Sequence, residues 1–289
     1  MTAQMAANPG ATIDELRRLF EHWGDVTAEP GGVDYLEVDA GGVPAMWAVP
    51  RQADTGKVLL CSHGGGYVVG SMYSHRKLFA HLAKAVGCRA LIVDYRRAPE
   101  NVLPGPVRDM VTAYRWLLEV QGLRATDIAL TGDSAGGALA ITTMALAREQ
   151  GLPLPVASLP MSPWAGADTS GASYEYNAAR DALVSRDTTG GLGMLAVGEQ
   201  GDPYHPLANP LYTDYHGLPP IYIQVGEAET LLEDSRRIAA RAKAAGVEVR
   251  LDEFPDMQHV FQFLAGAAPE ADEAIARMAA WVRPRLGLN

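Results

Sequence analysis

Residues 128–136 read Ile-Ala-Leu-Thr-Gly-Asp-Ser-Ala-Gly, and this stretch decides the fold. Its apolar start is typical of a buried strand, and Gly132-Asp133-Ser134-Ala135-Gly136 is a G-x-S-x-G pentapeptide that leads into a helical run. The glycines allow a sharp turn from strand to helix, which lifts the serine hydroxyl clear of the sheet. Free N–H groups at the start of the helix would face any negative charge that develops there. The stretch therefore predicts a nucleophilic serine at the edge of an α/β sheet.

On both sides of this stretch, apolar runs alternate with helical patterns. We expect strands at 33–38, 43–49, 57–62, 89–95, 128–131, 155–160, 221–225 and 247–254. We expect helices at 12–23, 75–86, 107–120, 136–150, 231–245 and 270–285. Such alternation predicts a mainly parallel sheet with helices on both faces. Residues 162–219 break the rhythm and contain no obvious strand, which is typical of a functional insertion.

Composition agrees with one enzyme-sized domain. The 289 residues are 48% hydrophobic and 20% charged, so the chain is neither disordered nor fibrous, and we treat 1–289 as a single α/β domain. The net charge of −10 has the wrong sign for binding a nucleic-acid backbone. The N-terminal residues lack a secretory pattern, and no apolar run approaches the roughly 18 residues of a membrane span. We therefore expect a cytoplasmic protein without a nucleic-acid or membrane partner.

Metal and redox sites are not indicated either. Cys61 and Cys88 are the only cysteines, and we expect two half-buried thiols in strands of a reduced protein, not a disulfide or a zinc site. The sequence contains no H-E-x-x-H motif or other tight cluster of histidines and carboxylates. We expect no metal and no cofactor.

A second glycine-rich motif follows the strand expected at 57–62. It is His63-Gly64-Gly65-Gly66-Tyr67. Consecutive glycines let backbone amides approach a substrate oxygen without obstruction by a Cβ atom. An H-G-G-G loop after an early strand supplies part of the oxyanion hole in lipases and esterases. A plain glycine turn would be the simpler interpretation of either motif alone, but the two together favour catalysis.

A serine nucleophile needs a base, which in this fold follows the acid in the chain. Of seven histidines, only His259, in the loop after the strand expected at 247–254, meets that condition. We expect His205 and His216 to be surface residues of the insertion. Four carboxylates follow the strand at 221–225, namely Glu227, Glu229, Glu233 and Asp234.

Local patterns narrow the choice of acid without completing it. Glu233 has capping-box spacing from Thr230, which predicts a structural task at the start of the next helix, and Asp234 would lie a turn inside that helix. Spacing alone does not choose between Glu227 and Glu229. Asp256 is a weaker rival, because it is better explained by the turn that it forms with Pro255.

Five segments carry a resemblance to a known family. They are HGGGYVVGS, DYRRAPE, GDSAGG, VGEAETLLEDS and MQHVFQ, in this order from about residue 33 to the C-terminus. In this respect the chain resembles the hormone-sensitive-lipase family of α/β-hydrolases, in its bacterial esterase branch. It departs from the family pattern at Arg97, where leucine is usual, at Gly105, where alanine is usual, and at Glu229, where aspartate is more frequent.

The resemblance implies an α/β-hydrolase fold with a mostly parallel eight-stranded sheet and a helical cap formed by about 1–30 and 162–219. It implies a catalytic triad of Ser134, Glu229 and His259. It also implies an oxyanion hole formed by the amides of Gly65, Gly66 and Ala135. Candidates for the walls of the substrate pocket are Phe20, Trp23, Tyr67, Trp164 and Leu183, together with Tyr174, Tyr176, Met194 and Leu195.

The expected function is hydrolysis of short- to medium-chain carboxylic esters through an acyl-enzyme. Hydrolysis of lactones of the monoterpene type on the same triad is the alternative. A non-catalytic small-molecule receptor on this fold is disfavoured, because related receptors lose the histidine that His259 represents here. The resemblance also implies a homodimer, in which the strand at 247–254 would lie at a sheet edge that needs protection.

Overall fold

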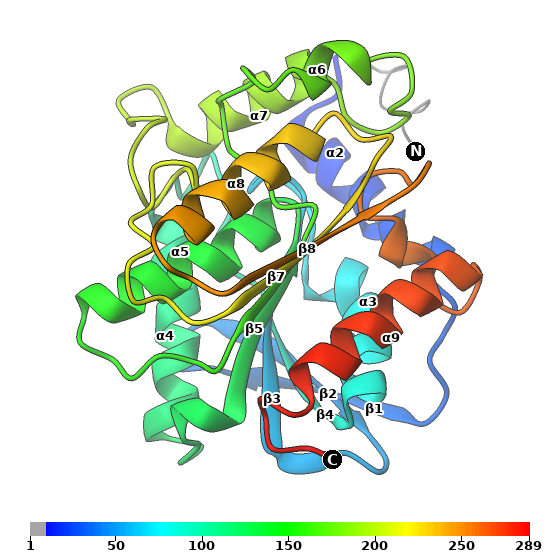
Figure 1. Ribbon diagram of the computed structural model, residues 1–289, viewed down its shortest axis with the longest axis vertical. Coiled ribbons are helices and arrows are strands. Elements are labelled where there is room, and N and C mark those ends of the chain that lie inside the picture. Colours follow the sequence, from blue (N-terminus) through cyan, green and yellow to red (C-terminus); the bar gives the residue numbers. More distant parts are fainter. Residues whose placement is uncertain (1–9) are drawn as a thin grey trace.

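A twisted mixed sheet lies at the centre of the molecule (Figure 1). The structure is a computed structural model that describes residues 10–289, and within them eight strands pair in the order β1-β2-β4-β3-β5-β6-β7-β8. β2 is antiparallel to both of its neighbours, and every other pair is parallel. The strands are β1 (Val33–Asp39), β2 (Pro44–Pro50), β3 (Asp54–Ser62), β4 (Cys88–Val93), β5 (Ile128–Asp133), β6 (Ser158–Met161), β7 (Ile221–Gly226) and β8 (Val249–Phe254). All eight predicted strands are confirmed.

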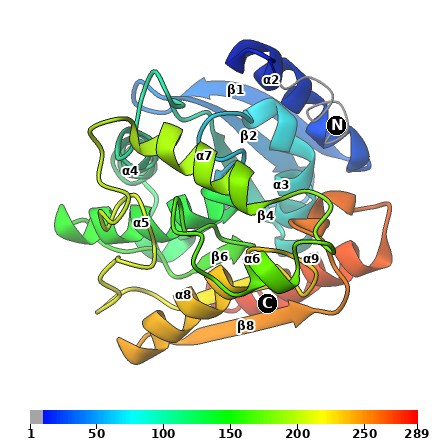
Figure 2. The ribbon, with the colours of Figure 1, turned by 90° about the horizontal axis from the view of Figure 1, so that it is seen from above.

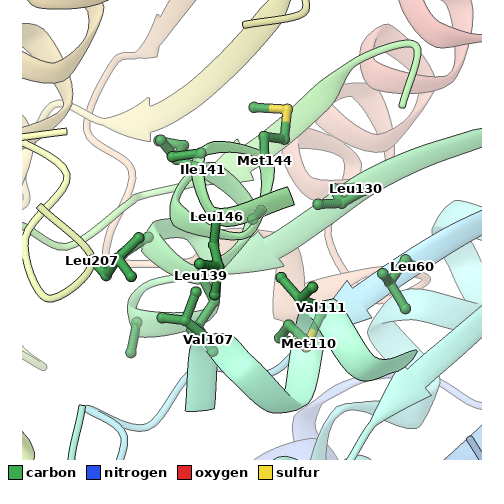
Figure 3. Packing of buried hydrophobic residues seen from close by; sticks show 14 of the residues in the cluster. Leu60, Val107, Met110, Val111, Leu130, Leu139, Ile141, Met144, Leu146 and Leu207 are labelled. Carbon is green, nitrogen blue, oxygen red and sulfur yellow. The ribbon is translucent and has the colours of Figure 1, made fainter. Parts of the chain in front are cut away.

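Helices cover both faces of this sheet. They are α2 (Ile13–Phe20), η1 (Glu21–Val26), α3 (Met72–Val86), α4 (Gly105–Glu119), η2 (Ala125–Asp127), α5 (Ala135–Glu149), α6 (Ser173–Tyr176), α7 (Arg186–Val197), α8 (Leu232–Ala244), η3 (Phe261–Leu264) and α9 (Pro269–Val282). α4, α5 and α8 pack on one face, and α3 and α9 pack on the other. On the first face, Leu60 and Leu130 of the sheet belong to the same buried cluster as Val107, Met110 and Leu139 (Figure 3).

The first described helix forms where its capping signal predicts. Thr12 and Glu15 form a reciprocal capping box, and the helix then tightens into the 3-10 turn η1, which runs three residues past the range expected at 12–23. Leu16 and Phe20 pack on Val68, Val69 and Ala98, which lie just beyond the H-G-G-G loop and in the loop after β4. The apolar face of α2 thus covers the segment after the H-G-G-G loop and the loop after β4. Residues 1–9 of the predicted cap lie outside the described residues.

The insertion at 162–219 contains two helices, α6 and α7, and no strand, as predicted. α6, α7 and α2 lie toward the same end of the molecule in Figure 1, and the view from above in Figure 2 places α7 between α6 and α2. His205 and His216, both in the insertion, are exposed, which agrees with the surface role expected for them. Leu192 of α7 packs against the same small cluster of buried residues as Leu16 and Phe20 of α2, although the two helices are far apart in the chain.

Two local predictions are wrong. Helix α8 has Leu231 as its N-cap residue and no side-chain cap, so Thr230 and Glu233 do not form the expected capping box. Asp181 of the insertion accepts the Thr230 amide proton that Glu233 would bind in a capping box, and the Ser173 hydroxyl accepts from the Glu233 amide in place of the Thr230 hydroxyl. Cys61 and Cys88 are fully buried, because β3 and β4 are central strands that are covered on both faces, and both are free thiols.

One buried carboxylate fastens the insertion to helix α8. Asp234, in the first turn of α8, is fully buried and accepts hydrogen bonds from the Ala165 amide (3.1 Å) and the Tyr174 hydroxyl (3.2 Å). Its other oxygen has no hydrogen-bond partner within residues 10–289. Burial outweighs these two bonds and raises the pKa of Asp234 to about 8. The group is therefore largely protonated at neutral pH.

This raised pKa predicts a pH-dependent stability. The pKa is above its unfolded value near 3.8, so the native state binds the extra proton and its stability falls as pH rises from about 4 to about 8. An Asp234→Asn variant keeps an acceptor and cannot ionise, so it should gain stability relative to the wild type across that window. Urea unfolding at several pH values measures the difference. The exposed Asp187→Asn is the control, and a difference that does not change with pH would contradict the prediction.

Candidate active site

Ser134 lies at the sharp turn between β5 and α5 with an unusual backbone conformation. Its φ of 53° and ψ of −119° are rare for a residue with a side chain, and its amide donates to the Met161 carbonyl (2.8 Å). The neighbouring glycines are required sterically, because a Cβ atom at Gly132 or Gly136 would collide with backbone carbonyl oxygens. The turn leaves Ser134 half-buried, whereas the flanking residues are buried. This is the sharp strand-to-helix turn that the pentapeptide predicts.

The H-G-G-G loop lies against this elbow. Gly64 donates its amide to Asp133 Oδ1 (3.0 Å), and a Cβ atom on Gly64 would collide with that carboxylate. Gly65 and Gly66 adopt φ values of 110° and 61°, which glycine tolerates at little cost. Asp133, the residue that precedes Ser134, therefore connects the loop directly to the turn. Sequence reasoning did not assign this role to Asp133.

Three backbone amides at this junction are free to bind a substrate oxygen. Among the described residues, the N–H groups of Gly65, Gly66 and Ala135 donate to no protein acceptor. Ala135 is the first residue of α5, where amides have no partner within the helix and the helix dipole favours negative charge. The Gly65 carbonyl accepts from Val68 (3.1 Å) and Val69 (2.9 Å), which fixes the loop. Such fixed donors suit an oxyanion.

Glu229 and His259 are paired in the interior. Nδ1 of His259 lies 2.8 Å from Oε2 of Glu229, whose side chain is fully buried. The other carboxylate oxygen accepts hydrogen bonds from the Ser162 hydroxyl (2.6 Å) and the Gly226 amide (2.5 Å). The carboxylate is therefore held from three directions, and it leaves Nε2 of His259 as the ring atom that can act on another group.

The rival acids lie elsewhere. Glu227 is half-buried, and its hydrogen bonds among the described residues are made by its backbone. Asp256 pairs with Arg180 (3.0 Å) at the surface, with its side chain 87% exposed. Neither carboxylate contacts the imidazole of His259, so the geometry brings together Glu229 and His259 alone.

The pKa of His259 reflects competing effects. Burial opposes the charged form of the ring, but the hydrogen bond and the negative charge of Glu229 favour it more strongly, with smaller contributions from Asp181 and Asp133. As a result, the pKa of His259 is raised above its ordinary value of 6.5. A stabilised imidazolium is what a general base requires once it has accepted a proton.

Ser162 is a member of this site that sequence reasoning missed. It follows β6 at the same sheet edge as Ser134, is fully buried, and adopts a positive φ of 46°. Its hydroxyl donates to Glu229 and accepts from the Val260 amide (3.4 Å), so it joins the loops that carry the acid and the histidine. The signal in the sequence that could have identified Ser162 is its position directly after a strand, at the sheet edge where the other site residues lie.

The candidates for pocket walls occupy different surroundings. Phe20 stacks on Trp23 (5.4 Å between ring centres), and Trp23 packs edge-on against Phe263 in η3. Tyr67 and Trp164 are fully buried, with their ring centres 5.7 Å apart. Leu183 is half-buried, as are Phe20 and Trp23, and Tyr174 is buried, whereas Tyr176, Met194 and Leu195 are at least two-fifths exposed.

A residue outside the predicted set contacts the H-G-G-G loop. Leu192 of α7 lies close enough to Gly66 that a Cβ atom there would collide with the leucine side chain. The insertion therefore reaches the loop directly.

Within the described part of the chain, no group of three or more histidine, cysteine or acidic side chains is arranged to hold a metal ion. No helix of residues 10–289 combines the length and the apolar character that crossing a membrane requires.

Comparison with known proteins agrees with this geometry. A family model described as alpha/beta hydrolase fold matches residues 59–263. An acetyl-hydrolase of Streptomyces hygroscopicus is 41% identical over 271 residues, which are 93% of this chain and 88% of the relative. An ethyl acetate hydrolase of Pseudomonas putida is 31% identical over 278 residues, which are 91% and 87% of the two chains.

Solved structures extend the likeness to three dimensions. The crystal structure of an esterase from the bacterial hormone-sensitive lipase family superposes with a TM-score of 0.95 at 43% identity, covering 99% of this chain and 96% of the other. The five segments that carry the resemblance, the mixed eight-stranded sheet and these matches lead to one conclusion. The chain belongs to the hormone-sensitive-lipase family of α/β-hydrolases.

Proposed function

We propose that the protein is a serine carboxylesterase that hydrolyses short- to medium-chain esters through an acyl-enzyme, with Ser134, Glu229 and His259 as its catalytic residues. The observation that carries this proposal is the buried hydrogen bond between Glu229 and His259 (2.8 Å), at the sheet edge where the Ser134 elbow also lies. The similarity to relatives named acetyl-hydrolase and ethyl acetate hydrolase supports small acyl groups as substrates.

The first half of the reaction forms the acyl-enzyme. Ser134 Oγ attacks the carbonyl carbon of the ester while Nε2 of His259 accepts its proton, because a neutral hydroxyl is a weak nucleophile. Glu229 holds the ring in the tautomer that leaves Nε2 free and stabilises the imidazolium. The same histidine then returns the proton to the departing alcohol.

The second half repeats these steps with water. His259 takes a proton from water, the hydroxide attacks the acyl-enzyme, and the proton passes to Ser134 as the acid leaves. In both tetrahedral intermediates, negative charge on the carbonyl oxygen would be bound by the amides of Gly65, Gly66 and Ala135. Amides that are fixed before the reaction need no reorganisation when the charge develops, which is the source of their catalytic effect. The reaction proposed here uses no cofactor.

The cap argues for a bounded pocket. The N-terminal helix packs beside the segment after the H-G-G-G loop, and Leu192 of the insertion contacts Gly66 within that loop. Walls at these positions favour short and medium acyl chains over long ones. We retain Phe20, Trp23, Tyr67, Trp164 and Leu183 as candidates for substrate contact, the first two from the N-terminal segment and the last two from the insertion.

Two further expectations accompany the proposal. β8 forms one edge of the sheet and pairs only with β7 among the described strands, and pairing with a second copy would cover this edge in a homodimer. The free thiols of Cys61 and Cys88 are in keeping with a reducing compartment, such as the cytoplasm.

Ser134→Ala tests the nucleophile. The variant should fold normally and lose hydrolysis of p-nitrophenyl acyl esters by about 10⁴-fold or more, since nucleophile and base act as a unit. A fluorophosphonate probe should label the wild type and not the variant. Retention of a tenth of wild-type turnover would mean another nucleophile, and absence of labelling in folded wild type would favour a receptor.

A second experiment distinguishes the two candidate activities. Turnover of a panel of esters from acetate to palmitate, measured beside monoterpene lactones, separates an esterase from a lactonase.

Glu229→Gln and Glu227→Gln test the acid. Glu229→Gln should lower kcat by roughly two to four orders of magnitude, since the amide no longer fixes the productive tautomer of His259 or stabilises its charge. Glu227→Gln should change kcat far less, because His259 bonds to Glu229 and the hydrogen bonds of Glu227 among the described residues are made by its backbone. The paired measurement is kcat for one ester in both variants. A greater loss in Glu227→Gln would show that the assignment of the acid is wrong by two residues.

The pH dependence of the reaction follows from the raised pKa of His259. Only the neutral ring accepts the serine proton, so kcat/KM should fall as pH decreases through a midpoint above 6.5. In Glu229→Gln, which lacks the neighbouring negative charge, this midpoint should move to lower pH. Initial rates from about pH 5 to 9 determine both midpoints. A wild-type midpoint below that of the variant would contradict the assignment of Glu229 as the stabilising charge.

A further inference from the structure

Residues 177–182 of the insertion contact the chain on both sides of Glu229. Asn177 is fully buried, and its side-chain amide donates to the carbonyl oxygens of Glu227 (2.8 Å) and Glu229 (2.7 Å). Both protons of this amide are thus used on the short segment that carries the acid. One buried side chain of the insertion fixes the backbone from which the Glu229 side chain extends.

Asp181 holds the next residue of the same segment. Its Oδ2 accepts from the Thr230 amide (2.7 Å) and the Thr230 hydroxyl (3.0 Å). Its Oδ1 accepts from the amides of Leu183 and Val184, both at 2.9 Å. The carboxylate therefore joins the backbone of the insertion to the residue that follows Glu229.

Gln258 makes the equivalent connection to the other catalytic loop. It is the residue before His259, and its side chain accepts from the Ala182 amide (2.8 Å) and donates to the Arg180 carbonyl (2.9 Å). Arg180 also pairs with Asp256 in the same loop. The segment 177–182 consequently contacts the acid loop and the histidine loop, which lie about thirty residues apart in the chain.

Backbone bonds join the two loops only before Glu229: among the described residues, the amides of Glu227 and Ala228 donate to the carbonyls of Phe254 (2.9 Å) and Met257 (3.1 Å). From Glu229 onward the acid loop depends on the insertion. It connects β7 to α8, and the first turn of α8 has no side-chain cap, so the polar backbone groups near Glu229 are not all satisfied locally. Glutamate also has one more rotatable bond than aspartate, so its carboxylate is located only as well as its backbone is. A displacement of about 1 Å in a catalytic group can cost about 10²-fold in rate.

We propose that Asn177, Asp181 and Gln258 are positioning residues, which hold the Glu229 and His259 loops at the separation that their hydrogen bond requires. The insertion would then set the geometry of the catalytic base in addition to covering the substrate. The kinetic consequence rests on the proposed esterase function. The structural consequence, an ordered hydrogen bond between Glu229 and His259, does not.

The chain offers matched controls for two of these residues. Asn209 is also a fully buried asparagine of the insertion, but its side chain accepts only from the Leu211 amide. Asp168 is an aspartate of the insertion that binds Ser170 and Arg237, without a bond to either catalytic loop. Loss of stability alone should affect the controls and the test variants alike, whereas loss of positioning should affect only the test variants.

Proton NMR of the His259 ring gives a readout that does not depend on turnover. The Nδ1 proton shared with Glu229 should produce a low-field resonance in the wild type, and Glu229→Gln assigns it. In Asn177→Ala this resonance should broaden by exchange with water or move upfield, and in Asn209→Ala it should stay as in the wild type. Circular dichroism verifies folding. If Asn177→Ala does not fold, the comparison of Asp181→Asn with Asp168→Asn decides in the same way.

Steady-state kinetics with a p-nitrophenyl ester provides the second arm. Asn177→Ala and Gln258→Ala should lower kcat by about tenfold to a hundredfold, with little change in KM, because the base is misplaced while the pocket is kept. Asn209→Ala should stay near wild-type kcat. The proposal would be overturned if Asn177→Ala kept the resonance of the wild type and had the same kcat as Asn209→Ala. Loss of the resonance in Asn177→Ala, with no ester turnover even in the wild type, would support positioning and reject the proposed function.

Discussion

Parallel pairing of six neighbouring strands, in the order β4-β3-β5-β6-β7-β8, brings their carboxyl ends to one edge of the sheet. Everything in the site depends on this constraint, since the functional groups come from loops that follow different strands. The H-G-G-G loop follows β3, and Ser134, Ser162, Glu229 and His259 follow β5, β6, β7 and β8. Groups separated by more than a hundred residues thereby become neighbours, and only short loops remain to be positioned.

Burying a carboxylate at this edge requires compensation. Removing a charge from water costs several kcal/mol unless hydrogen bonds replace the lost hydration. Glu229 is fully buried and accepts from Ser162, Gly226 and His259, so each of its oxygens is satisfied. Asp234, five residues later, accepts two hydrogen bonds on one oxygen only, and its pKa is raised to about 8. Burial, which these two hydrogen bonds do not offset, thus favours the neutral form of Asp234.

The sequence predicts those parts of the fold that have a local pattern. Apolar runs identify all eight strands, the pentapeptide around Ser134 identifies the elbow, and chain order selects His259. For the acid, spacing left Glu227 and Glu229 open, and the resemblance chose Glu229, which is the carboxylate that contacts His259. That choice required information on relatives, since both glutamates follow the same strand.

The remaining features have no local pattern. Ser162 and Asn177 bond to the acid loop across 67 and 52 residues of chain, and no spacing rule connects such segments. The capping box expected at Thr230 fails for the same reason: Asp181, 49 residues away, accepts from the Thr230 amide, and Ser173, 60 residues away, accepts from the Glu233 amide. Tertiary partners thus replace both bonds of the local motif. Local rules are therefore least reliable where the insertion meets the catalytic loops.

The two halves of the site are held together by different physical means. Around Ser134 the backbones of β3, β5 and α5 approach so closely that Gly64, Gly132 and Gly136 cannot carry a Cβ atom, and this half is fixed by steric contact. Around His259 the loops also approach closely at Gly226, where a Cβ atom would collide with the Met257 carbonyl, but the segment from Glu229 to Thr230 is held in addition by polar side chains of the insertion. Steric contact tolerates almost no displacement, whereas a hydrogen bond persists over a few tenths of an ångström. The turn at Ser134 is thus fixed by close backbone contact. The segment of Glu229 and the loop of His259 depend in addition on hydrogen bonds from the insertion.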